Sequence, residues 1–203
     1  MTPALWLASR SPRRAALLAT LGVDFSVLDV EVDETPLPGE AAAAYVCRLA
    51  RAKALAGQLH APSAAPVLAA DTTVVLDGAL LGKPGDAAEA HRMLRGLAGR
   101  WHEVLTGVAL AHTRLEVTCV TTRVCFRALS DAEIACYIAS GEPFDKAGAY
   151  AIQGLGAALV DRLEGSHANV VGLPLVETLI LLRAAQVPTA LDHIPDGAEA
   201  PSV

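Results

Sequence analysis

The chain has 203 residues, of which 53% are hydrophobic and 19% are charged, and its formal net charge is −6. This balance excludes intrinsic disorder for most of the chain, and the negative charge excludes the basic surface that bulk nucleic acid requires. The longest uncharged stretch, 54–70, contains two prolines and several polar side chains, so a membrane span is excluded as well.

Strand and helix signals follow one another along the chain. Short apolar runs and alternating patterns predict strands, and a serine or aspartate before an apolar period predicts a helix start. Asp77-Gly78 is a dipeptide typical of tight hairpins. In chain order we expect a strand at 4–8, a helix at 11–22, a strand at 25–32, a helix at 40–59, a two-stranded hairpin at 67–81, a helix at 86–97, strands at 103–111 and 115–128, a helix at 130–140, a strand at 150–160 and a helix at 174–185. Such a mixture predicts an α/β or α+β domain.

The junction between the first strand and the first helix is a candidate anion site. Free backbone N–H groups and the positive end of the helix dipole lie there, beside the hydroxyls of Ser9 and Ser11. Arg13 and Arg14 fall in the first helical turn, where cations oppose the dipole unless an anion compensates them. Phosphate is the expected ligand. The alternative is an ordinary capped helix with solvated arginines.

Carboxylates occur at two further places. Those at 31–34, ending with Glu34, either hold a divalent metal or form a solvated acidic loop. Asp71 lies between two apolar runs, so we expect it to be partly buried, where a carboxylate needs a cation, a metal or a catalytic role. Lys83 lies across the expected hairpin and is predicted to come near Asp71. A structural ion pair is the alternative.

The stretch 145–156 is broken by glycines and contains Lys146 and Gln153. Glycines permit close backbone approach to a ligand, and a glutamine amide can pair with a nucleobase edge. The pattern alone is not diagnostic, because glycine-rich turns are common. The phosphate-binding patterns GxxxxGK[ST] and GxGxxG are both absent.

Thirteen arginines stand against only three lysines, Lys53, Lys83 and Lys146. Lysine carries a compact ammonium, whereas arginine carries a planar fork. Because arginine is so much more frequent in this chain, the three remaining lysines indicate positions that require a compact cation. Base composition combined with chance is the alternative.

The cysteines and the N-terminus indicate the compartment. Cys47, Cys119, Cys125 and Cys136 lack CxxC spacing, so we expect free thiols rather than a zinc or disulfide scaffold. Arginines follow the first apolar run almost at once, so no signal peptide is expected. The predicted location is the cytoplasm.

Several short motifs recur in a recognisable order and spacing. They are LASRSPRR at 7–14, VDET at 32–35, RLARAKA at 48–54, AADTTVV at 69–75, LGKP at 81–84, DKAGAYAIQGLGA at 145–157 and VVGLPL at 170–175. Together they resemble the Maf nucleoside triphosphate pyrophosphatases over nearly the whole chain. The form DKAGAYxIQG is similar to the dTTP/UTP branch rather than the branch that acts on 7-methyl-GTP.

The resemblance implies an α/β fold with a mixed β-sheet, in an elongated two-lobed body with a central cleft. It implies hydrolysis of the α–β phosphoanhydride to a nucleoside monophosphate and pyrophosphate, with a divalent cation, Mg²⁺ or Mn²⁺. By position, Asp71 matches the family's proton acceptor. With the chemistry above, the expected site is Asp71, Lys53 and Lys83 for catalysis, Arg13, Thr72 and Gln153 for substrate choice, Ser9, Ser11, Arg14 and Lys146 for phosphate binding, and Glu34 with Asp71 for metal binding.

We expect this domain to span 1–186, and the stretch 187–203, where periodicity ends, to be frayed. The expected partner is a nucleoside triphosphate, with no nucleic acid and no membrane, and a homodimer is left open. One alternative function is a pyrophosphatase for 7-methyl-GTP or for inosine- and xanthosine-type triphosphates. Another is a nucleotide-binding regulator of cell division without turnover.

Overall fold

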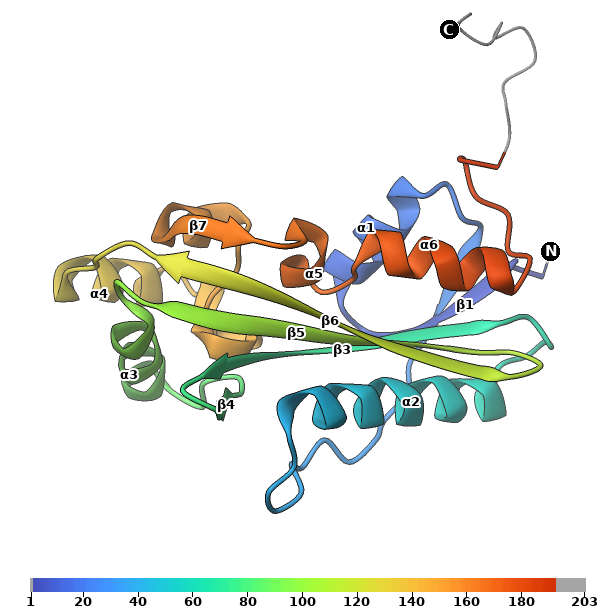
Figure 1. Cartoon of the computed structure of the whole chain (residues 1–203), viewed down its shortest axis with the longest axis horizontal. Helices are drawn as coiled ribbons and strands as arrows, with labels where there is room; N and C mark the ends of the chain where they lie inside the picture. The colour runs from blue at the N-terminus through green and yellow to red at the C-terminus, as the bar shows by residue number, and fades with distance from the viewer. Residues whose placement is uncertain (1, 193–203) are drawn as a thin grey trace, which may run out of the picture.

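The computed structural model describes residues 2–192 of the chain. Its body is elongated and divided into two lobes that share one mixed β-sheet (Figure 1), which confirms the expected α/β architecture. In chain order the elements are β1 (Leu5–Ala8), α1 (Pro12–Thr20), β2 (Phe25–Leu28), α2 (Ala42–His60), β3 (Val67–Leu76), β4 (Ala79–Leu81), α3 (Ala87–Leu97), β5 (Trp101–Ala111), β6 (Leu115–Phe126), α4 (Asp131–Ala139), the 3-10 turns η1 (Glu142–Asp145), η2 (Ala147–Ala149) and η3 (Gly154–Leu159), β7 (Val160–Glu164), α5 (His167–Val171) and α6 (Leu175–Ala184).

The sheet has the strand order β2-β1-β3-β5-β6-β7, and β4 pairs with β3. β1 runs parallel to β2 and β3, whereas all other pairs are antiparallel. β1 covers β3 only at Val67 and Leu68, and β4 covers it only from Val74 to Leu76. Between these points, residues 69–73 of β3 have no described strand on that side. This stretch of the edge is therefore open.

The hairpin between β3 and β4 confirms the turn prediction. Asp77 and Gly78 have φ angles of 51° and 80°. Two successive positive φ angles are what a two-residue turn with the correct twist requires.

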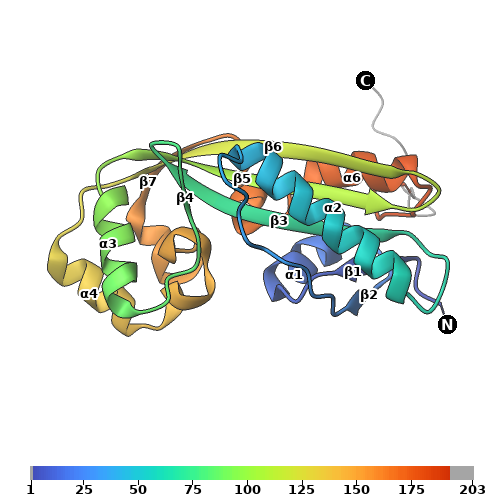
Figure 2. The same cartoon turned by 90° about the horizontal axis from the view of Figure 1, so that it is seen from below.

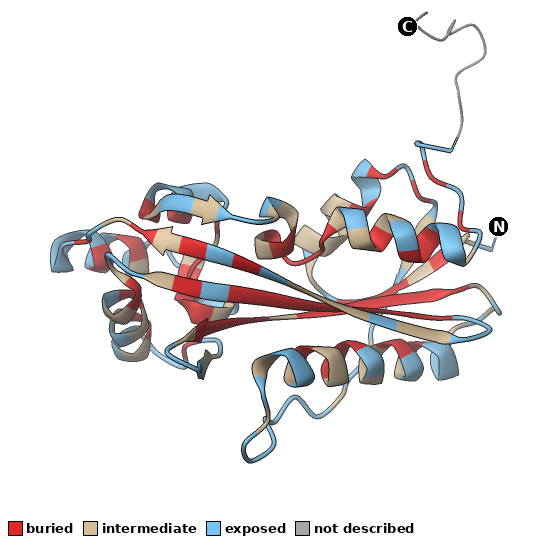
Figure 3. Cartoon of the chain, viewed as in Figure 1, coloured by how far each residue is buried: buried red, intermediate tan, exposed pale blue. Residues whose placement is uncertain are grey.

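The first lobe packs helices on both faces of the sheet. α2 lies along one face, and α1 and α6 cover the other (Figures 1 and 2). Buried residues run along the strands beneath these helices (Figure 3). The core between the sheet and α1 and α6 includes the fully buried side chains of Leu5, Leu7, Leu18, Leu68 and Leu182.

On the other face, α2 packs closely against the sheet at Gly107 of β5. A Cβ at this position would lie 2.4 Å from the carbonyl oxygen of Val46 in α2. Only glycine permits this approach, and the close contact fixes how far the helix lies above the sheet.

The second lobe surrounds the other end of the long strands with α3, α4 and the 3-10 turns (Figure 2). The helix expected at 130–140 is confirmed, and it begins with a capping box: the hydroxyl of Ser130 accepts from the N–H of Glu133, whose carboxylate accepts from the N–H of Ser130. The core of this lobe includes the buried side chains of Leu94, Leu97, Phe126, Ile134 and Tyr137.

The structure corrects the sequence prediction near the C-terminus. The strand expected at 150–160 is instead the 3-10 turn η3, and the strand β7 begins only at Val160. The carboxylate of Glu142 accepts from the N–H groups of Leu155 and Gly156, which stabilises the turn. The short helix α5 was not predicted.

The predicted frayed tail, 187–203, falls partly outside the described residues. Within 187–192 the chain is packed: Val187 is 4% exposed, and the N–H of Ala190 donates to the carbonyl of Leu21. An ion pair between Arg183 and Asp192 also ties this segment to α6. Fraying therefore does not describe 187–192. None of the helices described is both long and apolar enough to cross a membrane.

Candidate active site

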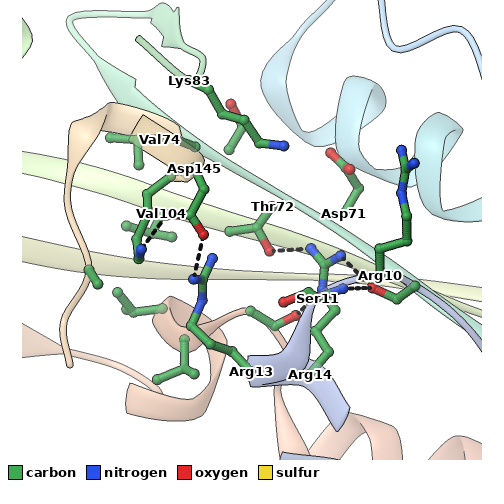
Figure 4. A pocket seen from close by; sticks show the side chains of 18 of the residues that line it. Arg10, Ser11, Arg13, Arg14, Asp71, Thr72, Val74, Lys83, Val104 and Asp145 are labelled. Carbon is green, nitrogen blue, oxygen red and sulfur yellow. Dashed lines mark hydrogen bonds and ion pairs between the residues drawn. The ribbon is translucent and has the colours of Figure 1, made fainter. Parts of the chain in front are cut away.

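A cleft of about 610 Å³ lies between the lobes, beside the open edge of β3 (Figure 4). Its walls come from the β1–α1 junction, the loop before α2, α2 itself, β3, the end of the β4 hairpin, the segment 145–153 that contains η2, and α5. The fold brings all the site residues expected from the sequence into this one cleft. They are Ser9, Ser11, Arg13, Arg14, Glu34, Lys53, Asp71, Thr72, Lys83, Lys146 and Gln153.

Lys53 lies between two carboxylates at the α2 side of the cleft. Its ammonium nitrogen is 2.7 Å from Oδ1 of Asp71 and 2.6 Å from Oε1 of Glu34. Asp71 is 8% exposed, as its apolar flanks predicted. Burial opposes ionisation of Glu34, but the hydrogen bond from Lys53 and the charges of Lys53, Lys83 and Arg14 hold the pKa of Glu34 below its usual value.

The cation beside Asp71 is therefore Lys53 and not Lys83, the residue that the hairpin predicted. Asp71 lies directly opposite Gly107 in the register of β3 and β5, so both face α2. Because Gly107 lets α2 approach closely, the helix carries Lys53 over Asp71. Lys83 enters the same cleft from the β4 side (Figure 4), and no described carboxylate lies within 4 Å of its nitrogen.

Two residues of α2 hold the acidic loop in place. The hydroxyl of Tyr45 donates to the backbone carbonyl of Glu34 at 2.9 Å. Arg48 donates to the carbonyl of Thr35 at 3.1 Å and pairs with Glu40 at 2.6 Å. Sequence reasoning missed Tyr45 and Arg48 as supporting residues, because no local pattern predicts how this loop packs on the helix.

Arg14 turns inward from the first turn of α1. Its guanidinium donates to the carbonyl of Gly172 at 2.8 Å, to Oγ of Ser9 at 3.2 Å and to Oγ1 of Thr72 at 3.1 Å. Burial lowers the pKa of Arg14, and the negative charge of Asp71 opposes that shift. Three of the five N–H groups of the guanidinium are thus used within the protein, and two remain for a ligand.

The second predicted phosphate arginine makes an ion pair across the cleft. Arg13 lies 3.3 Å from the carboxylate of Asp145, which also pairs with Lys146. Lys146 donates in addition to the carbonyl of Glu142 at 2.9 Å. Asp145, which sequence reasoning did not single out, therefore pairs with two cations expected at the substrate site, Arg13 from the first lobe and Lys146 from the second. Ser11 occupies the N-cap of α1, but its side chain makes no capping hydrogen bond.

Gln153 is exposed on the wall formed by the second lobe, next to η3. Tyr150 lines the same wall, and its hydroxyl lies 2.7 Å from Nε2 of His102. His102 is 3% exposed, and burial lowers its pKa to about 4, so the ring is neutral at pH 7. The sequence offered no spacing that would single out His102.

The predicted metal ligands are two carboxylates, Glu34 and Asp71. Among residues 2–192, no group of three or more histidines, cysteines, aspartates and glutamates is arranged to hold an ion. Glu34 and Asp71 nevertheless converge on one cation, the ammonium of Lys53. Mg²⁺ is commonly held by one or two carboxylates together with substrate phosphates and water. These residues fit such an ion when a phosphate ligand completes its coordination.

The sequence has close curated relatives. A protein of Myxococcus xanthus (strain DK1622) named dTTP/UTP pyrophosphatase is 59% identical over 184 residues, which cover 91% of this chain and 93% of that protein. One of Escherichia coli O157:H7 with the same name is 55% identical over 179 residues, covering 88% of this chain and 91% of that protein.

The fold has a more distant relative among solved structures. The Ham1 protein of Staphylococcus aureus superposes with a TM-score of 0.51 at 16% identity, covering 89% of this chain and 96% of that one, so the likeness concerns the fold alone. The family model described as Maf-like protein matches residues 4–185, a range that includes both lobes and every wall of the cleft. The chain therefore belongs to the Maf family.

Proposed function

We propose that the protein hydrolyses dTTP and UTP at the α–β phosphoanhydride and releases a nucleoside monophosphate and pyrophosphate. One observation carries the proposal: a single cleft holds two carboxylates, Asp71 and Glu34, that share the ammonium of Lys53, together with further lysine and arginine side chains from both lobes. Two close relatives, at 59% and 55% identity, bear the name dTTP/UTP pyrophosphatase.

Asp71 is the proposed general base. Only its Oδ1 receives the hydrogen bond from Lys53, and no described residue donates to Oδ2. Oδ2 can therefore take the proton of a water molecule that attacks the phosphorus atom. Lys53 keeps the carboxylate charged and in place. A base held within reach of its proton typically contributes about 10²–10⁴-fold to a rate.

A triphosphate brings several negative charges into an acidic protein, so local cations must offset them. Phosphoryl-transfer chemistry needs such positioning and charge neutralisation more than covalent help. The two remaining N–H groups of Arg14 and the ammonium of Lys83 are the proposed ligands of the phosphates. Arg13 and Lys146 can join them if they exchange Asp145 for a phosphate oxygen.

A divalent cation, Mg²⁺ or Mn²⁺, is the proposed cofactor, with Glu34 and Asp71 as its protein ligands. When bound, such an ion polarises phosphate oxygens and neutralises developing charge. Free nucleotides are the proposed partners, and the cytoplasm is the proposed location.

Substrate choice is assigned to Gln153, Arg13 and Thr72, which all line the cleft. Uracil and thymine present carbonyl acceptors next to an N3–H donor, and an amide offers one donor and one acceptor to match. Cytosine presents an amino group and a bare N3 instead. One unpaired buried polar group costs about 1–3 kcal/mol, which corresponds to roughly tens-fold discrimination against CTP.

Pyrophosphate release from a nucleotide panel with Mg²⁺ or Mn²⁺ tests the proposal. dTTP and UTP are expected to be turned over faster than CTP, GTP, ITP and 7-methyl-GTP. Asp71→Asn should lower turnover of dTTP by about 10²–10⁴-fold without unfolding the protein. Asp24→Asn, at an exposed position outside the cleft, is the matched control. Faster release from a purine triphosphate, or nucleotide binding without release, would establish one of the alternative functions instead.

A further inference from the structure

A chain of hydrogen bonds runs from the cleft into the centre of the protein. Nη2 of Arg14 donates to Oγ1 of Thr72 at 3.1 Å, which lies 2.9 Å from Oγ1 of Thr106. Oγ1 of Thr106 donates in turn to the backbone carbonyl of Asn169 at 2.9 Å. Thr106 and Asn169 are fully buried, so water does not replace these partners.

The two ends of this chain fix its direction. A guanidinium can only donate, and a carbonyl oxygen can only accept. The N–H groups of Gly172 and Leu173, just after α5, both donate to the carbonyl of Ala168 and not to that of Asn169. The hydroxyl of Thr106 is therefore the donor to the carbonyl of Asn169. If Thr106 donated to Thr72 instead, a lone pair of its Oγ1 would face a lone pair of the Asn169 carbonyl oxygen at 2.9 Å. That buried carbonyl would then lack a hydrogen-bond donor.

The direction leaves Thr72 with a single function toward the cleft. A threonine hydroxyl has one proton and two lone pairs. The proton of Thr72 is committed to Thr106, and one lone pair is taken by Arg14. What remains is one lone pair, on a residue that lines the cleft and is visible there in Figure 4.

We infer that Thr106 is a positioning residue for substrate choice: it makes Thr72 an obligate hydrogen-bond acceptor, which selects a donor group on the nucleoside part of the substrate. This inference rests on the proposed function. Phosphate oxygens at neutral pH only accept hydrogen bonds, so Thr72 is not one of their ligands. A pyrimidine nucleotide offers two kinds of donor, a sugar hydroxyl and the imide N3–H.

Two analogues of dTTP separate these sources. 3′-Deoxythymidine triphosphate lacks the sugar hydroxyl, and N3-methylthymidine triphosphate lacks the imide proton. A neutral hydrogen bond is worth about 2- to 10-fold in an equilibrium or rate constant. For the wild type, kcat/KM should fall by at least this factor with the analogue that lacks the donor facing Thr72.

The variant Thr106→Val removes the hydroxyl and keeps the shape. The proton of Thr72 is then free to serve acceptor groups, so the ratio of kcat/KM for dTTP to that for the sensitive analogue should fall by about 2- to 10-fold. Thr106→Ser restores the hydroxyl and should restore the ratio. Thr122→Val is the matched control, since Thr122 is also buried and bonds the side chain of Asn169 but does not contact Thr72.

The outcomes are distinct. A Thr106→Val variant that slows dTTP and both analogues by the same factor has lost only stability or packing, which overturns the inference. Insensitivity of the wild type to both analogues also overturns it, while leaving the proposed function intact. A wild type that releases no pyrophosphate from dTTP refutes the proposed function, and this inference with it.

Discussion

Replacing Lys53 by methionine should destabilise the fold and create a stronger dependence on divalent cations. The Lys53 side chain is 12% exposed, and its ammonium contacts two carboxylates at 2.6 and 2.7 Å. Without it, Asp71 is left buried, and a second negative charge about 5 Å away repels it by about 3 kcal/mol at an effective dielectric constant of 20. Glu34 is 52% exposed and can turn partly into solvent, which reduces this figure.

The expected loss is therefore about 2–4 kcal/mol at pH 7, close to the values for breaking a buried ion pair. For a chain of this size, this corresponds to a fall in Tm of about 5–15 °C, measurable by calorimetry. Mn²⁺ or Mg²⁺ should recover much of the fall, because both carboxylates are then free to hold the ion. Arg51→Met removes the same charge from an exposed position of the same helix and is the control.

An unchanged Tm for Lys53→Met would show that the ammonium does not compensate these carboxylates. The absence of any stabilisation of the Lys53→Met variant by Mn²⁺ would show that Glu34 and Asp71 are not the metal ligands. Either result refutes the argument from this geometry.

Three further changes have defined expectations. Gln153→Ala should reduce the preference for dTTP over CTP more than it reduces the best rate, and a substrate panel measures both. Gly107→Ala would place a Cβ 2.4 Å from the carbonyl oxygen of Val46, so we expect a loss of at least about 2 kcal/mol in denaturant unfolding. Burial lowers the pKa of His102 from 6.5 to about 4, so at pH values between these two the unfolded chain binds a proton at His102 and the folded chain does not. The free energy of unfolding should therefore fall by about 3 kcal/mol as the pH is lowered from 6.5 to 4, and His102→Gln should abolish this contribution.

The sequence predicted well those elements whose signals are local. Asp77-Gly78 marked the hairpin correctly, because the two positive φ angles that the turn needs are a property of that dipeptide. The helix expected at 130–140 also begins where its serine indicated, because the cap that Ser130 forms involves only residues of the first helical turn. The stretch 150–160 was assigned wrongly, because the contact that folds it into a 3-10 turn comes from Glu142, outside the segment.

The site was predictable as a set of residues but not as a set of pairs. The resemblance to the Maf family and the chemistry of the motifs predicted which side chains share one site, and the structure places them all in the cleft. The partner of Asp71 was assigned to Lys83 from chain proximity, whereas α2 supplies Lys53. That choice depends on helix-to-sheet distance, which is set by a glycine on a third element, Gly107. No pattern within one segment carries such information.

The long strands β3, β5 and β6 have a mechanical consequence for the cleft. They run without interruption from one lobe into the other, and their ladders of hydrogen bonds are continuous from 67 to 75 on β3 and along the whole of β5. A hinge concentrates rotation in a few residues that change φ and ψ strongly, and here such a change would have to break three strands at one level. The shared sheet therefore resists hinge bending between the lobes. Side chains that stand on these strands, such as Asp71 and Thr72, keep fixed positions relative to one another in the cleft wall.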